Sequence, residues 1–525
     1  MTVVEKEIKQ TSSNSFSTTP KILVFSSLFS TFLVLVPIAY LVIRSNEKGF
    51  NYFLSLLFRL RTLETLFISV SLSLTVSVGA LFLGVYVASL LAKTNTYFRR
   101  FFILIMPLPL AIPSYVIAYS YLVLIPKLQG FWISALVLIL ATFPFVAIPT
   151  FAFLRNINID QEEVARSLGL RPIQVFYRII WPQVRVASFA GALLSALYAI
   201  SEFGTVSFMR LDTFTRVIYT TYRASFDRSA AASLGIMLVL VSLIVVYLEK
   251  KSRGRISKSS TSKLYGSVFQ LKKARYFSAL SLLSIYIFSI GIPAYVLISR
   301  SISVRSDVNL FELVVLTLNT SWVAFLGACL SVILALPIAI LISRFKSRFA
   351  KVLESSFLVT HALPGVVVGL SLVAIGAKYL NGIYQTLYLL AIAYALLFVA
   401  NSLGSVRSNL EKIPQNFEEV SRSLGQNYFV TLKRVILPIA TPGIFSGWLL
   451  VFVSAMKELP ATLMLKPTGF ETLSTSLWTA TSISQFAQAA PFALALVLVA
   501  SIPSYLLNRP NVAEKSGIGE NLKYD

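Results

Sequence analysis

Two carboxylates, Glu202 and Glu458, are the residues whose type and position could do chemistry in this chain. They stand 256 positions apart, at equivalent places in a repeated pattern, and each is expected to lie well inside an apolar stretch. A carboxylate in such a stretch is costly to bury and usually faces a cavity or a partner cation. The two could therefore offer hard oxygen ligands to a metal cation. An internal ion pair, or a position nearer the outer surface, would explain the same residues without that role.

The elements that must position these residues are long apolar spans. Of the 525 residues, 56% are hydrophobic and only 13% are charged, which is too apolar for a soluble protein of this size. The apolar runs reach the ~20 residues that a helix needs to cross a bilayer. We therefore predict an all-α polytopic membrane protein with about 12 transmembrane helices in two parallel six-helix repeats. The predicted spans are 22–43, 65–92, 101–125, 131–154, 183–206, 230–248, 276–299, 313–343, 352–378, 383–404, 441–465 and 487–507.

Proline and glycine interrupt the third span of each half. Pro107, Pro109 and Pro113 lie in the first half, and Pro364 and Gly365 lie at the corresponding place in the second. A proline frees a backbone carbonyl, which survives in a membrane only where neighbours or a water-filled path satisfy it. The pattern indicates either a packing kink or a path-lining segment.

The basic residues predict the orientation and the domain layout. The 46 Lys and Arg residues exceed the 22 Asp and Glu residues and gather at the ends of spans, as the positive-inside rule describes, so we do not predict nucleic-acid binding. The basic turn 44–64 argues against this orientation but is outnumbered. The predicted layout is a cytoplasmic tail 1–21, a six-helix domain 22–248 with a cytoplasmic segment 156–182, a basic cytoplasmic linker 249–275, a six-helix domain 276–507 with a cytoplasmic segment 412–438, and a cytoplasmic tail 508–525.

A charged pattern recurs in the two cytoplasmic segments. Its matched residues are Glu162, Glu163, Ala165, Gly169 and Pro182 in the first copy, and Glu418, Glu419, Ser421, Gly425 and Pro438 in the second. Asp160 and Asn416 stand three residues before Glu163 and Glu419, a spacing that predicts a capping box. The two glycines are expected to end the helix in a left-handed conformation. Each segment should then read helix, glycine turn, second helix, proline and membrane span.

This pattern resembles the motif that marks the membrane subunits of bacterial binding-protein-dependent ABC importers. That motif is Glu-Ala-Ala, three residues, Gly, nine residues, Ile, one residue and Leu-Pro. This chain departs from it at Val164, Val420, Ser421, Val435 and Trp181 and keeps the glycine and proline spacing. The resemblance implies a type I ABC importer fold in the bacterial inner membrane. It also implies an extracytoplasmic substrate-binding protein and a dimer of ABC ATPase subunits, to which the ten matched residues would couple transport.

The chain itself contains no G-x-x-x-x-G-K-[ST] phosphate-binding loop. We therefore expect that it is not an enzyme, that it binds no cofactor, and that ATP is used by the partner subunit. No firm set of metal ligands is evident, and the expected partners besides the two proteins are membrane lipids.

Two further stretches resemble the fused permeases for ferric iron. They are Lys457–Leu465 and Thr472–Thr475, the latter leading to Trp478. The resemblance implies ferric iron as the substrate, with Glu202 and Glu458 on its path. Thiamine or a phosphonate-like anion, carried by the same architecture, is the alternative. A proton- or sodium-driven secondary transporter can also have twelve spans in two parallel halves, but it needs no duplicated docking segment.

Overall fold

The computed structural model describes residues 20–157, 159–224, 227–253, 269–303, 309–345 and 347–508. Within these ranges the regular structure is helical, apart from an isolated bridge between Thr94 and Phe269. Ten of the described helices are long and apolar enough to cross a membrane, and two bent helix pairs raise the number to as many as twelve. The all-α prediction with about twelve spans is therefore confirmed.

The two halves repeat one order of elements. The first half consists of α2 (Lys21–Ser45), α3 (Phe50–Leu57), α4 (Leu60–Lys93), α5 (Arg99–Ile105), η1 (Leu108–Leu110), α6 (Ser114–Leu124), α7 (Phe131–Arg155), α8 (Ile159–Ser167), α9 (Pro172–Val175), η2 (Phe176–Ile180), α10 (Trp181–Ser201), α11 (Gly204–Phe208), α12 (Phe214–Ala224) and α13 (Arg228–Arg253). The second half consists of α14 (Ala274–Tyr286), η3 (Ile287–Gly291), α15 (Ile292–Ser303), α16 (Leu310–Arg344), α17 (Arg348–Val359), η4 (Thr360–Ala362), α18 (Gly365–Tyr379), α19 (Leu387–Leu410), α20 (Asn416–Ser423), α21 (Tyr428–Thr431), η5 (Leu432–Ile436), α22 (Leu437–Met456), α23 (Pro460–Leu465), α24 (Leu473–Ser482) and α25 (Phe486–Asn508).

The third span of each half is broken rather than continuous, which corrects the predicted spans 101–125 and 352–378. The axis turns by 93° between the two parts in the first half and by 104° in the second. The later helices, α6 and α18, begin directly after Pro113 and Pro364. Proline lacks the backbone N–H that would continue the preceding helix, but its fixed φ suits a position at a helix start. The prolines that interrupt the third spans in the sequence therefore mark a sharp turn between two helices.

Three helices form the centre of each half, α4, α7 and α10 in the first and α16, α19 and α22 in the second. The matched glycines Gly191 and Gly447 stand at corresponding crossings. A Cβ atom on Gly191 would lie 2.3 Å from the carbonyl oxygen of Phe145, and one on Gly447 would lie 3.2 Å from that of Ser402. Small residues let membrane helices approach closely, so these crossings depend on glycine.

The first helix of each half packs against the opposite half. Helix α2 contacts α16, α17 and α18, and the Ser371 hydroxyl donates to the carbonyl oxygen of Pro37 at 3.1 Å. In the same way, Leu282 and Tyr286 of α14 are buried in a cluster with Val87 and other residues of the first half. The two halves therefore interlock.

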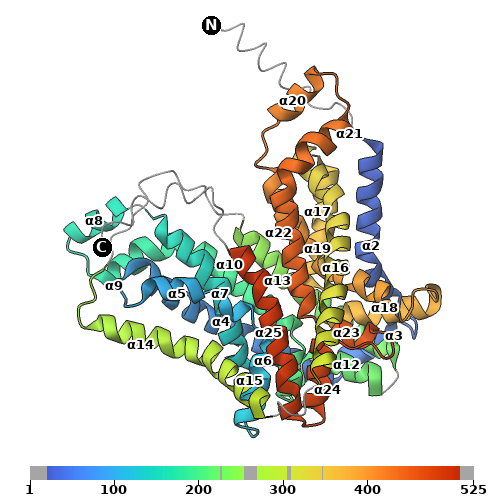
Figure 1. Ribbon diagram of the computed structural model, residues 1–525, viewed down its shortest axis with the longest axis horizontal. Helices are drawn as coiled ribbons and strands as arrows, with labels where there is room; N and C mark the ends of the chain where they lie inside the picture. The colour runs from blue at the N-terminus through green and yellow to red at the C-terminus, as the bar shows by residue number, and fades with distance from the viewer. Residues whose placement is uncertain are drawn as a thin grey trace.

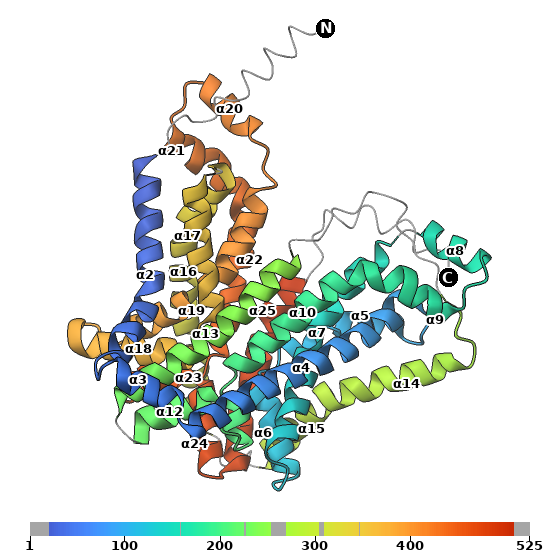
Figure 2. The ribbon, with the colours of Figure 1, turned by 180° about the vertical axis from the view of Figure 1, so that it is seen from behind.

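Figures 1 and 2 show a molecule with two arms. Helices α4, α5, α7 and α10 run in one arm, and α2, α16, α17, α19 and α22 run in the other. The repeated polar segments, α8–α9 and α20–α21, lie at the separate ends of the two arms. The arms join at the opposite end of the molecule, near α6, α15 and α24.

Candidate functional site

Both repeated segments end their first helix in the same left-handed turn. Gly169 has a φ of +82° and Gly425 a φ of +77°. In the first copy the Gly169 N–H donates to the carbonyl of Arg166 at 2.9 Å, and the Leu170 N–H donates to that of Ala165 at 3.2 Å. The second copy repeats these bonds at 2.7 and 3.1 Å. This is the Schellman arrangement, which satisfies the last carbonyls of a helix, and it confirms the conformation predicted for both glycines.

The capping box predicted at Asn416 and Glu419 is wrong. Helix α20 starts at Asn416, its N-cap is Gln415, and no side chain caps it. Asp160 lies in the first turn of α8, and its side chain is outside the described part of the structure, so the first capping box stays a prediction. In the second copy the first turn begins earlier, at Pro414, whose carbonyl accepts from the Phe417 N–H. A proline's fixed φ is already suited to a first helical turn, which explains the earlier start.

The first glutamate of each pair is buried and anchors its segment. Glu162 forms an ion pair with Lys93, the last residue of α4. Glu418 forms one with Arg344, the last residue of α16, with 2.7 Å between Oε1 and Nε. All four side chains are buried. The pKa of Glu418 is raised above its ordinary value because the effect of burial outweighs the opposing effect of the nearby Arg344. Each segment is thus joined to the end of the second span of its own half.

Lys93 and Arg344 are partners of these glutamates that the repeated pattern does not include. Their position in the sequence could have suggested this role, because each is the basic residue that ends the second span of its half. Ala165 and Ser421 also face inward, and the hydroxyl oxygens of Ser421 and Thr431 lie 2.7 Å apart.

The opposite face of each segment is open and partly apolar. Glu163 and Glu419 are exposed, unlike the glutamates that precede them. The exposed apolar side chains here are Val164, Leu168, Val420 and Leu424, with exposed fractions of 57%, 77%, 60% and 73%. We call these four residues and the two exposed glutamates the outer faces of the segments. Such a face, rigid and with a mixed apolar and acidic surface, is suited to a partner's groove.

Pro182 and Pro438 lie in the first turn of α10 and α22, as predicted, but no boundary separates the second helix of each segment from the span that follows. Instead, a π-helical turn precedes each proline, η2 in the first copy and η5 in the second. The Trp181 N–H donates to the carbonyl of Phe176, five residues back, and the Leu437 N–H does the same to Leu432. Because proline donates no bond of its own, the ladder widens there without ending the helix. Helices α9 and α21 are therefore continuous with α10 and α22.

Glu202 and Glu458 lie at the far ends of these two spans, not well inside them. Helix α10 has 21 residues and α22 has 20, and both end just before the glutamates. At ~1.5 Å per residue, each helix is about as long as the ~30 Å hydrocarbon thickness. The carboxylates therefore lie about one membrane thickness from the repeated segments.

Each carboxylate caps the short helix that follows it. Oε1 of Glu458 accepts from the Ala461 N–H at 3.0 Å, and Oε2 accepts from the N–H and the hydroxyl of Thr462 at 3.0 and 2.9 Å. Oε1 of Glu202 accepts from the Thr205 N–H at 2.9 Å. Unpaired N–H groups at a helix start favour a negative charge. Within the described ranges, no group of three or more His, Cys, Asp and Glu residues could hold a metal ion.

These caps stand against the breaks of the third spans. A Cβ atom on Gly204 would lie 2.6 Å from the Cβ of Tyr115, at the start of α6. The Tyr198 hydroxyl, on α10, donates to the Ser114 hydroxyl at 2.9 Å. In the second half, Gly365 at the start of α18 adjoins Glu458. In each half, the break in the third span and the glutamate that follows the fifth span therefore lie side by side, although they are far apart in sequence.

The two halves meet at the same place through Lys457. Its ammonium donates to the carbonyl of Leu110, beside the first-half break, at 3.0 Å. The Tyr115 hydroxyl donates back to the carbonyl of Lys457 at 3.3 Å. The first half has Ser201 at the equivalent position, so this contact exists in one copy only. Nothing in the repeated pattern predicts this contact.

An aromatic cluster continues the contact between the halves. Trp478 packs on Phe203 and Phe208, with ring centroids 5.2 and 5.1 Å away. Nearby, the Ser474 hydroxyl donates to the carbonyl of Glu458 at 3.2 Å. The stretches 457–465 and 472–478, separate in the sequence, therefore form one central contact region with the first half. We call this region the central junction.

Comparison with known proteins covers both halves. Residues 80–258 and 327–509 match the family model described as "Binding-protein-dependent transport system inner membrane component". The chain is 34% identical over 483 residues to the Fe(3+)-transport system permease protein FbpB 2 of Haemophilus influenzae, covering 90% of this chain and 95% of that protein.

Two further relatives are more distant. One, from Haemophilus influenzae, is named as the ferric transport system permease protein FbpB 1, and it is 24% identical over 64% of this chain and 57% of its own length. The other, from Salmonella typhimurium, is named as the 2-aminoethylphosphonate transport system permease protein PhnV, and it is 28% identical over 37% of this chain and 73% of its own length.

Proposed function

The chain belongs to the family of binding-protein-dependent transport system inner membrane components, and from this premise we propose that it is the permease subunit of an ATP-driven importer that moves ferric iron into the cytoplasm. The proposal that the substrate is ferric iron rests on the 34% identity to an Fe(3+)-transport permease over 90% of the chain. The family assignment also disfavours a secondary transporter driven by protons or sodium.

We propose that a dimer of ABC ATPase subunits docks on the outer faces of the two repeated segments. Three observations support this docking. The two faces are alike, they lie at the ends of separate arms, and each segment is anchored by a buried ion pair to the second span of its half. Closure of the ATPase dimer would bring the two segments together and turn α10 and α22 with them, because α9 and α21 are continuous with these spans through the π-helical turns.

We place Glu202 and Glu458 on the substrate path as gate residues. Their oxygens accept bonds from the short helices α11 and α23 of their own halves, so they fix the backbone beside the central junction in the arrangement seen here. Separation of the halves would break the bond from Lys457 to Leu110 and rearrange the caps. The carboxylates would then be able to meet a ferric ion as hard oxygen ligands.

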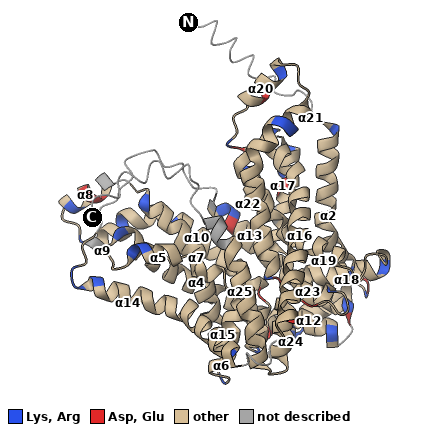
Figure 3. Ribbon diagram, in the orientation of Figure 1, with Lys and Arg blue, Asp and Glu red and all other residues tan. Residues whose placement is uncertain are grey.

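The charge distribution supports an orientation with the repeated segments in the cytoplasm. Figure 3 shows Lys and Arg positions, coloured blue on the ribbon, gathered at the ends of the arms around α5, α9 and α21. By the positive-inside rule these ends face the cytoplasm, and both chain termini would lie on the same side. An extracytoplasmic binding protein would meet the opposite end, where Asp212 and Arg216, at the start of α12, form an ion pair.

Uptake of labelled ferric iron tests the substrate. Cells that lack this chain should take up iron poorly, and expression of the chain together with its ATPase and binding-protein partners should restore uptake. Thiamine and 2-aminoethylphosphonate uptake should be unchanged by the chain. Restored uptake of either of these compounds without iron uptake would contradict the proposal.

A phosphonate-like anion is the second candidate, and one contact favours it. The ammonium of Lys457 places a positive charge at the central junction, where an anion would pass. The relative named for 2-aminoethylphosphonate transport matches only 37% of this chain, against 90% for the iron relative. We therefore rank iron first.

A further inference from the structure

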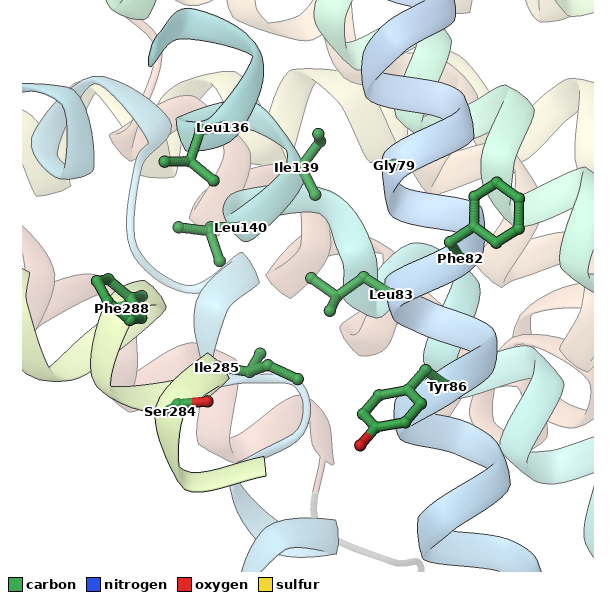
Figure 4. A pocket seen from close by; sticks show the side chains of 10 residues that line it. All are labelled: Gly79, Phe82, Leu83, Tyr86, Leu136, Ile139, Leu140, Ser284, Ile285 and Phe288. Carbon is green, nitrogen blue, oxygen red and sulfur yellow. The ribbon is translucent and has the colours of Figure 1, made fainter. Parts of the chain in front are cut away.

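An apolar pocket of about 750 Å³ lies away from the central junction, between the first half and the helix that crosses to it from the second half. Figure 4 shows its walls. Phe82, Leu83 and Tyr86 of α4 form one side, Leu140 of α7 lies above, and Ile285 of α14 and Phe288 of η3 close the other side. Because α14 and η3 belong to the second half, the pocket is a seam where the interlocked halves meet.

The pocket is open toward the side of the molecule that faces lipid. Phe82 is 73% exposed and Phe288 is 48% exposed, although both lie on spanning helices. The nearest hydroxyl pair, Tyr86 and Ser281, is already satisfied, with 2.7 Å between the oxygens. A space with apolar walls and satisfied polar groups is suited to a hydrocarbon chain from the bilayer.

A cluster of basic residues lies at one end of this seam. There the chain before α5 and the start of α14 run side by side, since the rings of Tyr97 and Tyr276 are 4.7 Å apart. The guanidinium of Arg275 lies 3.8 Å from the centre of the Tyr97 ring. Arg100, Lys272 and Lys273 are exposed around this contact, and Figure 3 shows the basic residues at this end of α14. No Asp or Glu occurs in 94–105 or 269–288.

The separation of the basic cluster and the pocket matches the depth of one lipid leaflet. Lys273 and Ser284 are eleven residues apart along α14. At a rise of ~1.5 Å per residue, this is ~16 Å, about half of the ~30 Å hydrocarbon core. A lipid whose headgroup lies at the basic cluster could therefore place an acyl chain in the pocket.

We propose that an anionic phospholipid of the cytoplasmic leaflet binds along α14. Its phosphate-bearing headgroup is held by Arg100, Lys272 and Lys273, and one acyl chain fills the pocket between α4, α7 and η3. The leaflet named here rests on the orientation given under the proposed function. The lipid fills a seam between the halves, so it would stabilise the crossing of α14 onto the first half.

Photo-crosslinking tests this site in the full chain reconstituted in vesicles. One set of vesicles carries phosphatidylglycerol with a diazirine in its acyl chain, and a matched set carries the same label on phosphatidylcholine. We expect phosphatidylglycerol to label peptides from α4 and α14, and phosphatidylcholine to label them much less. Equal labelling by the two lipids, or no labelling of these helices, would overturn the proposal.

Two variants locate the headgroup and the chain. Lys272→Gln with Lys273→Gln should lower phosphatidylglycerol labelling on the order of tenfold, since each basic residue near an anionic surface contributes to binding. Arg59→Gln with Arg61→Gln, two exposed residues at the other end of α4, is the matched control and should change nothing. Ser284→Trp should block the pocket and abolish labelling, and Ser284→Ala should keep it. Full labelling of Ser284→Trp would contradict the assigned pocket.

The readout is independent of transport. If iron uptake fails while labelling by phosphatidylglycerol persists, the proposed function falls and the lipid site stands. If labelling fails while uptake is normal, only the lipid site falls.

Discussion

The Oε1 atom of Glu458 occupies the space beside Gly365, so that a Cβ atom on residue 365 would lie only 2.2 Å from it. The carboxylate caps α23, and the glycine starts α18 directly after the break in the third span. The bend before α18 and the cap of α23 therefore depend on the same close contact, between Gly365 and the Glu458 carboxylate. A side chain at position 365 would have to displace the carboxylate.

Gly365→Ala should therefore impair transport. The added methyl group forces the Glu458 carboxylate away from the Ala461 and Thr462 N–H groups, and such overpacking costs ~1–3 kcal/mol. Iron uptake in cells and thermal unfolding of the purified protein measure the effect. Gly404→Ala is the matched control, because nothing lies within 4 Å of a Cβ atom at that helical position. Equal uptake by the two variants would show that the contact is unimportant.

The two left-handed glycines should be sensitive to side-chain shape rather than to size. Nothing lies within 4 Å of a Cβ atom on Gly169 or Gly425, but both have positive φ. Valine is strained in that conformation, by ~1–2 kcal/mol or more, whereas asparagine visits it readily. Gly425→Val should lower uptake and weaken co-purification of the ATPase, and Gly425→Asn should preserve both. Loss of function in both variants would point to a direct contact of the glycine with the partner.

The two neighbouring glutamates of each segment should behave differently. Glu418→Gln leaves Arg344 buried without its counter-charge, and breaking a buried pair costs ~3–5 kcal/mol. Glu419→Gln removes only an exposed charge and should change the free energy of unfolding little. Replacing both partners, Arg344→Met with Glu418→Leu, should recover much of the loss. Thermal unfolding in detergent distinguishes these cases, and a similar fall in melting temperature for the two single variants would refute the assignment.

The outer faces should be needed for the partner and not for the fold. Leu424→Asp places a charge where an exposed apolar side chain is available for docking. We expect the variant to reach the membrane and unfold at the wild-type temperature but to lose the ATPase on purification. Ile302→Asp, at an exposed apolar residue of α15, is the comparison variant and should keep the partner. Retention of the ATPase by Leu424→Asp would exclude this face as the docking surface.

The contacts of Asp227, directly before α13, should show a defined pH dependence. The Asp227 carboxylate accepts from the Lys48 ammonium at 2.7 Å, the Tyr52 hydroxyl at 2.9 Å and the Ala230 N–H at 3.0 Å. Burial alone would raise the pKa of Asp227, but these bonds outweigh it and lower the pKa to about 2.

Because this folded pKa is below the unfolded value of ~3.9, the carboxylate contributes its full stability above that value. The contribution is lost as the pH falls toward about 2. The difference in melting temperature between the wild-type protein and Asp227→Asn should therefore be constant from pH 7 to pH 5 and shrink below pH 4. A difference that grows on acidification would have the wrong sign for this arrangement.

Much of the architecture follows from local properties of the chain. The apolar runs predict spanning helices because a membrane leaves the backbone no other partners. Gly169 and Gly425 predict a left-handed stop because few other residues adopt that conformation without strain. Pro113 and Pro364 mark the third-span interruptions for a similarly local reason, since proline cannot donate a backbone hydrogen bond. These features needed no knowledge of the rest of the chain.

What only the tertiary structure decided are the relationships between distant residues. The sequence showed Glu162 and Glu163 side by side, but only the position of Lys93 made the first an anchor and left the second exposed. The sequence placed Glu202 and Glu458 well inside spans, whereas the fold put them at helix ends as caps. The single contact from Lys457 to Leu110 joins residues 347 positions apart. Periodicity and spacing report a residue's own helix, and they carry no information on which distant carbonyl, carboxylate or glycine packing brings beside it.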